Sequence, residues 1–514
     1  MLLSACVAAY SAFAGLKIGG VYWPIITTSL VSLAVLKALG NSNSHETAIM
    51  QTIGSSGGLL AGGIIFTIPA AWMLGISVSV YDIILIALTG GILGIIFSYP
   101  LRKQLIEREA LPCADGAAAA SLIQAGDSKG KKSKILVYAF SAGAAFSILR
   151  DWLNAIPGVV NLDTLKIEAG KIFSLGSSVS LIPFAGGFLI GPRFTLAWFL
   201  GAVTTFFVMI PYALTAGIFA SKGEVLSLIA RPLGVGIVLG AAIAYFLLKG
   251  VPALGSAFHD YKKARWGKQA GLLLIVSAGV LTIIAQLSVV VSIIAIVGAF
   301  AMAYVASRIT GEMNVDPMEI FAMLVMLFAK IFLGFTAFPL IVIAAVVTIA
   351  AGMAGDMMQD LKAGHLLGVK PESQMLAQMA GLLAASLVIG IVVISINQAY
   401  GIGGVEFPAP QAVAIKEIVQ SAGISQALLA GLVLGLALTF VSSKLGWGIV
   451  PVAFGIGLYV PMELSLPLFI GGLVRYAVDK RRQTDYYRIV AAGLIAGEGL
   501  VGVLITLAAF SSLL

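Results

Sequence analysis

The run Phe338-Pro-Leu-Ile-Val-Ile-Ala-Ala-Val-Val-Thr-Ile-Ala-Ala-Gly-Met-Ala-Gly355 contains no charged side chain and leads directly into Asp356. At about 1.5 Å per helical residue, such a run crosses most of the roughly 30 Å apolar core of a bilayer. Comparable runs recur along all 514 residues and are continuous rather than alternating. Continuous runs favour transmembrane helices over the strands of a β-barrel. The sequence therefore predicts an all-α polytopic membrane protein.

The composition supports the same fold class. Hydrophobic residues make up 60% of the chain and charged residues only 11%, whereas about a quarter of the residues of soluble domains are charged. So few charges could not cover the surface of a soluble protein of this size, which excludes a soluble enzyme and a disordered chain. Two cysteines and three scattered histidines predict neither a disulfide framework nor a metal site.

The length allows about 16 transmembrane helices, because a span with its loop needs roughly 30 residues. Two segments, Leu111 to Gly126 and Phe407 to Gly423, are too short and too mixed to span. We expect them to be re-entrant or interfacial short helices. Irregular backbone at membrane depth survives only inside protein or beside a water-filled cavity.

The net charge of +8 is concentrated rather than spread. Lysine and arginine cluster in four short windows between apolar runs: 102–108, 129–134, 249–268 and 475–488. Basic loops mark the cytoplasmic side of membrane proteins, so we expect all four windows in the cytoplasm. This distribution favours the lipid bilayer over nucleic acid as the partner, and a multi-pass protein of the plasma membrane.

Several segments recur in the same order along the chain. Leu111-Pro-Cys-Ala-Asp-Gly116 resembles Phe407-Pro-Ala-Pro-Gln411, and Pro192-Arg-Phe-Thr-Leu196 aligns with Met462-Glu-Leu-Ser-Leu466. These matches predict an N-terminal transmembrane repeat at 1–249, a basic cytoplasmic linker with an extra span at 250–285, and a C-terminal transmembrane repeat at 286–514. Two repeats with the substrate between them near the midplane are typical of secondary transporters.

Two polar clusters interrupt the apolar runs. The first, around Asn43 to Gln51, either caps a helix or lines a cavity. In the second, Asp356, Gln359 and Asp360 would share one face of a helix. Carboxylates, an amide and an ammonium group together can hold a zwitterionic or metal-chelated ligand, although a solvated interfacial loop is the alternative.

Three blocks carry a resemblance to a known family: Ala14-Gly-Leu-Lys-Ile-Gly19, Arg308-Ile-Thr-Gly-Glu-Met-Asn-Val-Asp-Pro317 and Gly355-Asp-Met-Met-Gln-Asp-Leu-Lys-Ala-Gly-His-Leu-Leu-Gly368. They resemble signatures of the oligopeptide transporter family, which includes the yellow-stripe-like metal-chelate transporters. Asn43–Thr47 and Gly493–Gly499 resemble further blocks. The chain looks like a compact prokaryotic member. The resemblance implies about sixteen spans and proton-coupled uptake of small peptides or metal–chelator complexes.

We therefore expect a secondary active transporter, not an enzyme, that imports small oligopeptides or peptide-like metal chelates. No G-x-x-x-x-G-K-[ST] motif occurs, and we expect no cofactor. An intramembrane enzyme acting on a lipid or peptide and a passive channel are the alternatives. The expected partners are the substrate, protons and the bilayer, with a homodimer left open.

The candidate site residues follow from these clusters and repeats. Opposite charges at Arg193 and Glu463, matched places of the two repeats, would suit the two ends of a zwitterion. The substrate-binding candidates are Asn43, His45, Glu46, Gln51, Arg193, Glu312, Asn314, Asp356, Gln359, Asp360, Lys362 and Glu463.

Glu498 is the predicted proton-coupling residue. It follows Arg488 by ten residues inside an apolar run, which places it about 15 Å into the membrane. An ionised carboxylate there is costly unless a cation approaches. Glu46 and Glu312 are the next candidates. In the alternative, Glu498 stays protonated and donates one interhelical hydrogen bond.

Overall fold

The structure is a computed structural model that describes residues 1–19, 24–40, 43–126, 131–161, 176–252, 268–284, 288–313, 316, 318–420, 425–446, 450–480 and 484–511. Within these residues nine helices are long and apolar enough to cross a membrane, and five shorter apolar helices accompany them. The predicted class, an all-α polytopic membrane protein, is confirmed. The expected number of about 16 spans stays a prediction.

The helices of the first half of the chain are α1 (Leu2–Ile18), α2 (Pro24–Leu39), α3 (Ser44–Ile65), α4 (Ile68–Met73), α5 (Val80–Ser98), α6 (Ala114–Gly126), α7 (Lys131–Ser147), α8 (Leu181–Ile190), α9 (Pro192–Val203), α10 (Ile210–Thr215), α11 (Lys222–Val225) and α12 (Arg231–Tyr245). Those of the second half are α14 (Lys268–Ile284), α15 (Val289–Met313), α16 (Met318–Leu333), α17 (Ala337–Leu367), α18 (Pro371–Tyr400), α19 (Pro410–Gln420), α20 (Gln426–Lys444), α21 (Val450–Gly457), α22 (Met462–Asp479) and α23 (Thr484–Ser511).

Tighter and wider helical turns extend several of these helices. They are the 3₁₀ turn η1 (Tyr99–Leu101) and the π-helical segments η2 (Lys103–Arg108), η3 (Ile148–Trp152), η5 (Thr204–Met209), η6 (Leu226–Ala230) and η7 (Phe246–Gly250). A small antiparallel pair, β1 (Val159–Asn161) and β2 (Gly176–Ser178), was not expected from the sequence. Strand β2 leads directly into α8 and so helps to place the start of that helix.

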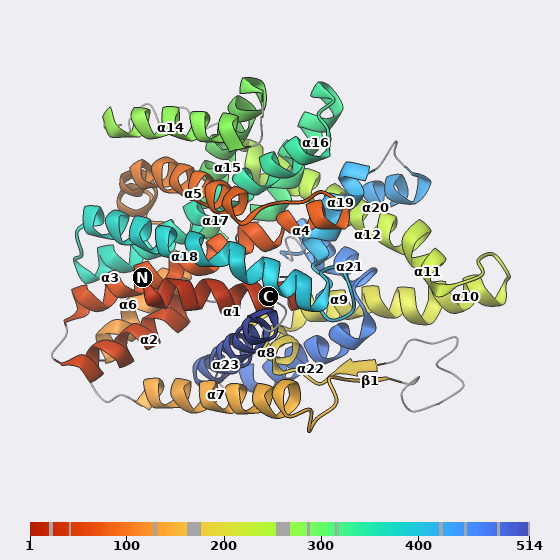
Figure 1. Cartoon of the computed structure of the whole chain (residues 1–514), viewed down its shortest axis with the longest axis horizontal. Coiled ribbons are helices and arrows are strands. Elements are labelled where there is room, and N and C mark those ends of the chain that lie inside the picture. Colours follow the sequence, from red (N-terminus) through yellow and green to blue (C-terminus); the bar gives the residue numbers. More distant parts are fainter. Residues whose placement is uncertain are drawn as a thin grey trace.

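Helix α17 lies inside the bundle, between α15 and α18 (Figure 1). Its apolar run is hydrophobic on every side, which is the pattern of a fully buried helix. All residues from Leu340 to Leu361 are buried accordingly. The helix ends at Gly368, which adopts the left-handed conformation (φ 74°) that favours glycine after a helix. Asp356, Gln359 and Asp360 are therefore buried in a helix and do not lie in a solvated loop, whereas His365 near the helix end is exposed.

Helices α7 and α23 run side by side along one edge of the molecule, the lower edge in Figure 1. A Cβ added at Gly143 of α7 would lie 2.5 Å from the Leu494 carbonyl oxygen of α23. One added at Gly497 of α23 would collide with the Phe140 carbonyl oxygen. Small residues at both faces thus allow close packing, which brings η3, at the end of α7, next to Glu498.

The two segments expected to be short helices are α6, with 13 residues, and α19, with 11 residues. Each is too short to span a bilayer. Each starts after a non-glycine residue with positive φ, Cys113 (41°) and Ala409 (42°). The Cys113 N–H donates to the Gly311 carbonyl at 2.9 Å, and the Ala409 N–H donates to the Leu16 carbonyl at 3.0 Å.

Each short helix therefore docks on a helix from the other end of the chain: α6 lies on α17 and α19 lies near α4 and the end of α1. Two related halves that exchange equivalent segments would produce this reciprocal docking. The boundaries at 1–249, 250–285 and 286–514 stay predictions, as does the membrane depth of α6 and α19.

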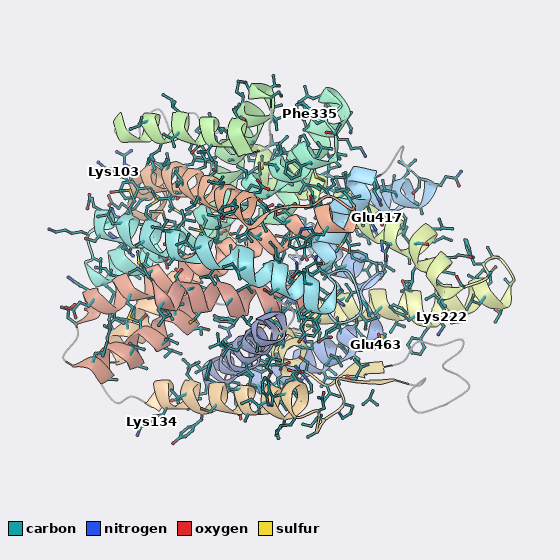
Figure 2. All side chains as sticks on the ribbon, in the orientation of Figure 1. Lys103, Lys134, Lys222, Phe335, Glu417 and Glu463 are labelled. Atoms are coloured by element: carbon teal, nitrogen blue, oxygen red, sulfur yellow. The ribbon has the colours of Figure 1, made fainter. Side chains whose placement is uncertain are left out.

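The basic windows lie partly within the described structure. Lys103 and Lys134 lie at the outer edge of the molecule (Figure 2). Parts of three windows, at 129–130, 253–267 and 481–483, lie outside the described residues. The cytoplasmic assignment of the windows stays a prediction.

Candidate functional site

Two carboxyl groups of α17 form the centre of a buried polar cluster. Asp356 and Asp360 are one helical turn apart and are 3% and 1% exposed. Two side chains of α3 donate to Asp360: Gln51 Nε2 to Oδ1 and Ser55 Oγ to Oδ2, each at 2.6 Å. The two polar blocks that the sequence singled out, 43–51 and 356–365, thus meet at Gln51 and Asp360.

Helix α18 adds two amide side chains to this cluster. Gln378 Nε2 donates to Asp356 Oδ2 at 3.4 Å. Gln374 Nε2 donates to the backbone carbonyl of Asp360 at 2.6 Å and lies 3.4 Å from Thr52 Oγ1. Both glutamines are at most 1% exposed. We call Gln51, Ser55, Asp356, Asp360 and Gln378 the aspartate cluster.

Gln359 and Lys362 contact other partners than the two aspartates. Gln359 Oε1 accepts from the Gly116 N–H of α6 at 2.9 Å, and its Nε2 donates to the Thr310 carbonyl at 3.0 Å. Lys362 Nζ donates to the Leu111 carbonyl at 2.8 Å. These two side chains hold α6 and the segment before it against α17. The ammonium group is therefore engaged with backbone and forms no ion pair with Asp356 or Asp360 among the described residues.

The carboxyl groups of the aspartate cluster have no basic partner among the described residues. Asp316, in the connection between α15 and α16, adds a third carboxyl group: a Cβ at Gly355 would lie 2.5 Å from its Oδ2. Within the described part of the chain, no lysine, arginine or histidine forms an ion pair with Asp316, Asp356 or Asp360. Nor do three His, Cys, Asp or Glu side chains there come together as metal ligands do.

The start of the 43–51 block has a local role. Asn43 Oδ1 accepts from the Glu46 N–H at 2.9 Å, and Glu46 Oε2 accepts from the Asn43 N–H at 3.2 Å. This reciprocal pair is a capping box that starts α3. His45 lies beside the end of α17, since a Cβ at Gly368 would be 3.8 Å from its Nε2. Capping thus accounts for Asn43 and Glu46, while Gln51 reaches the buried carboxyl groups.

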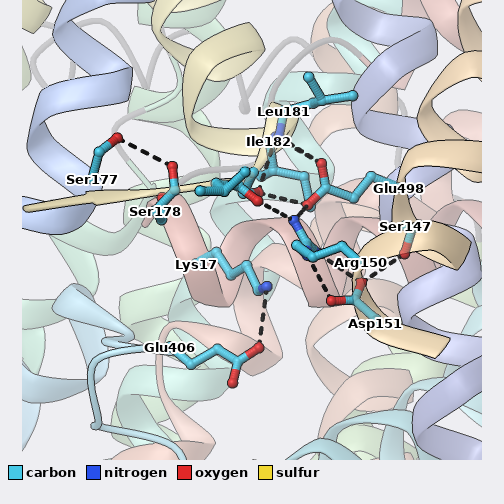
Figure 3. A network of polar contacts seen from close by, with 12 residues as sticks. Lys17, Ser147, Arg150, Asp151, Ser177, Ser178, Leu181, Ile182, Glu406 and Glu498 are labelled. Carbon is cyan, nitrogen blue, oxygen red and sulfur yellow. Dashed lines mark hydrogen bonds and ion pairs between the residues drawn. The ribbon is translucent and has the colours of Figure 1, made fainter. Parts of the chain in front are cut away.

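Glu498 belongs to a second buried cluster (Figure 3). Its side chain is 0% exposed, and Oε1 accepts from Arg150 Nη1 and from Ser180 Oγ, each at 2.6 Å. Its Oε2 accepts from the backbone N–H groups of Leu181 and Ile182, the first residues of α8, at 2.7 and 3.2 Å. The unpaired N–H groups at a helix start favour an anion.

Arg150 is shared between two carboxyl groups. Besides Glu498, it contacts Asp151 through Nε and Nη2, each at 2.6 Å, and Asp151 also accepts from Ser147 at 2.8 Å. A third ion pair, Lys17 with Glu406 at 3.5 Å, lies close by (Figure 3). Of the five charged groups, two are positive and three negative.

The remaining candidates lie apart from both clusters or outside the described residues. Arg193 is exposed in the first turn of α9, and Glu463 is half-buried in the first turn of α22. No ion pair joins them within the described structure. Asn314 and the side chain of Glu312 lie outside the described residues.

Sequence reasoning missed Arg150, Asp151, Gln374 and Gln378. Arg150 follows the apolar run of α7, and an ionisable residue in such a place marks function or a buried partner. Gln374 and Gln378 lie four residues apart, so they share one face of α18. Both signals are visible in the sequence, but the sequence does not show that Arg150 meets Glu498 or that Gln378 meets Asp356.

Comparison with known proteins gives consistent matches. The family model described as "OPT oligopeptide transporter protein" matches residues 1–270 and 256–509. A Haemophilus influenzae protein named "Putative oligopeptide transporter" is 25% identical over 96% of this chain and 92% of its own length. The "Metal-nicotianamine transporter" YSL2 of Arabidopsis thaliana is 26% identical over 29% of this chain and 25% of its own length.

Proposed function

The chain belongs to the oligopeptide transporter family, and from this premise we propose that it imports small oligopeptides or peptide-like metal chelates by proton-driven secondary active transport. The family and its named relatives are transporters, so the chain is a membrane transporter and not an enzyme. Neither an intramembrane enzyme nor a passive channel is favoured. The plasma membrane as its location and a homodimer as its assembled form belong to the same proposal.

The observation that carries the proposal is the enclosure of charged groups by apolar helices. Asp356, Asp360 and Glu498 are each at most 3% exposed in a chain whose helices are apolar. Ionisable residues inside membrane segments are costly and typically serve substrate or ion pathways. The aspartate cluster offers carboxylates and amides to a positively charged group, such as the ammonium end of a peptide or the metal of a chelate.

The proposed substrate residues are therefore those gathered around α17, with the ends of α3, α9 and α22 as a second set. The first set consists of Gln51, Asp356, Gln359, Asp360 and Lys362. The second set consists of Asn43, His45, Glu46, Arg193 and Glu463, together with Glu312 and Asn314.

Proton coupling is proposed for Glu498, with Arg150 as its counter-ion. Arg150 contacts two carboxylates, so this trio carries one excess negative charge. A proton on Glu498 would neutralise that excess, and Arg150 would keep Asp151 as its partner. Buried ion pairs are stable only when no charge is left uncompensated, which makes the shared arginine suited to a carboxyl group that changes its charge.

Transport by the purified protein in liposomes tests the proposal. Di- to hexapeptides and iron or nickel chelates are offered from outside, with and without an inward proton gradient. We expect accumulation above the external concentration that requires the gradient and collapses when a protonophore is added. Flux that only equalises the concentrations would indicate a channel, and chemical conversion an enzyme. Liposomes that carry Asp82→Asn, a change at an exposed helix cap, serve as the matched control.

A further inference from the structure

The two buried carboxyl clusters differ in the chemistry of their partners. Glu498 accepts from a guanidinium group and two backbone N–H groups, which can only donate, and from the Ser180 hydroxyl group. Asp356 and Asp360 accept from the amides of Gln378 and Gln51 and from the Ser55 hydroxyl. An amide group can donate through its nitrogen or accept through its oxygen. A glutamine can therefore satisfy either protonation state of a carboxyl group.

The amide oxygens at the aspartate cluster are available to accept a hydrogen bond from a protonated carboxyl group. Gln51 Oε1 and Gln378 Oε1 are buried and accept no hydrogen bond in the structure. Both side chains are 0% exposed. Rotating either amide by half a turn would present this oxygen to the neighbouring carboxyl group. An O–H group on that carboxyl would then donate to an acceptor that is costly to leave buried and unpaired.

Charge balance points the same way. Asp356 and Asp360 are neighbours on one helix, and Asp316 Oδ2 would lie 2.5 Å from a Cβ at Gly355. Burying neighbouring carboxylates without a cation is unfavourable because both lose their hydration and the two charges repel each other. Holding a proton at the pair removes one of these charges.

The charged groups of the surrounding elements do not supply the missing cation. On α15, Arg308 pairs with Glu109 at 2.8 Å, and Arg102, before η2, pairs with Glu107 and contacts His365 of α17. Lys362 of α17 donates to the Leu111 carbonyl.

Lys330, in the last turn of α16, donates to the Val419 carbonyl at 3.1 Å. Further charged groups of the packed elements are acidic or lie at helix starts. They are Glu319 at the start of α16, Asp115 on α6, Glu372 at the start of α18, and His45 and Glu46 at the start of α3. On the described faces of α3 and α18 that meet Asp356 and Asp360, the contacts are neutral amides and a hydroxyl group.

We propose that Asp356 and Asp360 form a second proton-loading site, separate from Glu498, in which Gln378 and Gln51 turn their amides as the proton arrives and leaves. The proton adds to a carboxylate oxygen and departs from the same oxygen, so no other bond is made or broken. The inference deepens the proposed proton coupling and rests on it for its role in transport. A proton and the positive group of a substrate would compete for the same carboxylates.

Infrared spectroscopy of the purified protein in lipid tests the site without substrate or gradient. A protonated carboxyl group gives a carbonyl band distinct from that of a carboxylate, and it shifts on exchange into D₂O. We expect wild-type protein at neutral pH to show such a band and to lose it as the pH rises. The double variant Asp356→Asn with Asp360→Asn should reduce the intensity of this band by the contribution of one carboxyl group. Glu498→Gln and Asp82→Asn should each leave the band unchanged.

A second variant tests the site while both aspartates are kept. Gln378→Lys supplies a cation beside Asp356 and imitates the pairing of Arg150 with Glu498, so the band should shrink at neutral pH. The proposal is overturned if the wild type shows no protonated carboxyl band, or if the aspartate double variant keeps the whole band. Because this measurement needs no transport, a failure of the proposed function would leave its result unaffected.

Discussion

Arg150 and Glu498 form a 2.6 Å ion pair across 348 residues of sequence, and both side chains are at most 5% exposed. The pair joins the end of α7 to the middle of α23, and Glu498 also binds the first N–H groups of α8. Three helices therefore meet at a single carboxyl group. A change in its charge therefore acts on contacts to all three.

Glu498→Gln is the direct test of this carboxyl group in transport. Glutamine keeps one acceptor oxygen, which can serve either Arg150 or the α8 N–H groups, and it cannot take up or release a proton. We expect the variant to lose uphill, gradient-driven accumulation in liposomes while it still exchanges substrate across the membrane. Normal accumulation would make Glu498 structural and move the search for the coupling residue to Glu46 and Glu312.

Arg150→Met should destabilise the protein by about 3–5 kcal/mol, because the buried Glu498 and the partly buried Asp151 lose their shared cation. Thermal unfolding in detergent measures the effect, and Arg475→Met is the matched control. Arg475 pairs with Asp479, which is 42% exposed, so its loss should cost at most about 1 kcal/mol. Adding Glu498→Gln to Arg150→Met should restore part of the stability; no recovery would contradict the pairing.

Asp356→Ala should weaken substrate binding by about tenfold or more, as expected when a charged hydrogen-bonding partner is removed. Binding of the peptide and chelate panel to purified protein provides the measurement. Thermal stability should stay near that of the wild type. If binding and stability are lost together, Asp356 holds helices together and does not contact the substrate.

Cysteine labelling tests the side on which the basic windows lie. Cysteines placed at Lys131 and Lys263 should resist impermeant maleimides in intact cells, and labelling of either would contradict the cytoplasmic assignment. The native Cys113 should add little background. Burial raises the pKa of its thiol to about 11, with Lys362 opposing the shift. Because the thiolate is the reactive form, labelling of Cys113 should rise only as the pH approaches that value.

Gly143→Ala should loosen the contact between α7 and α23. The added methyl group would lie 2.5 Å from the Leu494 carbonyl oxygen and 3.1 Å from the Glu498 N–H nitrogen. Overpacking of this kind costs about 1–3 kcal/mol, measurable as a lower melting temperature in detergent. Gly279→Ala on α14 is the matched control, since nothing lies within 4 Å of the added carbon. Equal effects of both changes would show that close packing at Gly143 is unimportant.

The sequence predicted much of the fold because apolar runs are local. The run before Asp356 identifies α17 as a helix without knowledge of any other segment. The short helices α6 and α19 were likewise predicted from their length and mixed composition. The number of spans was not, because short apolar helices such as Leu181–Ile190 are ambiguous by length alone.

The sites were predictable only in part. The block around Asp356 was recognised by its density of polar residues, yet its partners Gln51 and Gln378 lie 309 residues away from Asp360 and 22 residues away from Asp356, respectively. Such pairs depend on how helices pack, which local patterns do not specify. Glu46 shows the opposite case: its spacing from Asn43 fits a capping box, and the structure forms one.

Because α6 and α19 each dock on a distant part of the chain, these contacts can form only after the later partner has been synthesised. Gln359, which holds the Gly116 N–H of α6, follows it by 243 residues, and Gln411 of α19 binds the Gly19 carbonyl across 392 residues. At about 5–20 residues per second, α6 is made roughly 10–50 s before its anchor exists. A nascent chain must therefore keep α6 undocked while later helices insert. A transcript truncated before Gln359 would leave that helix without its anchor.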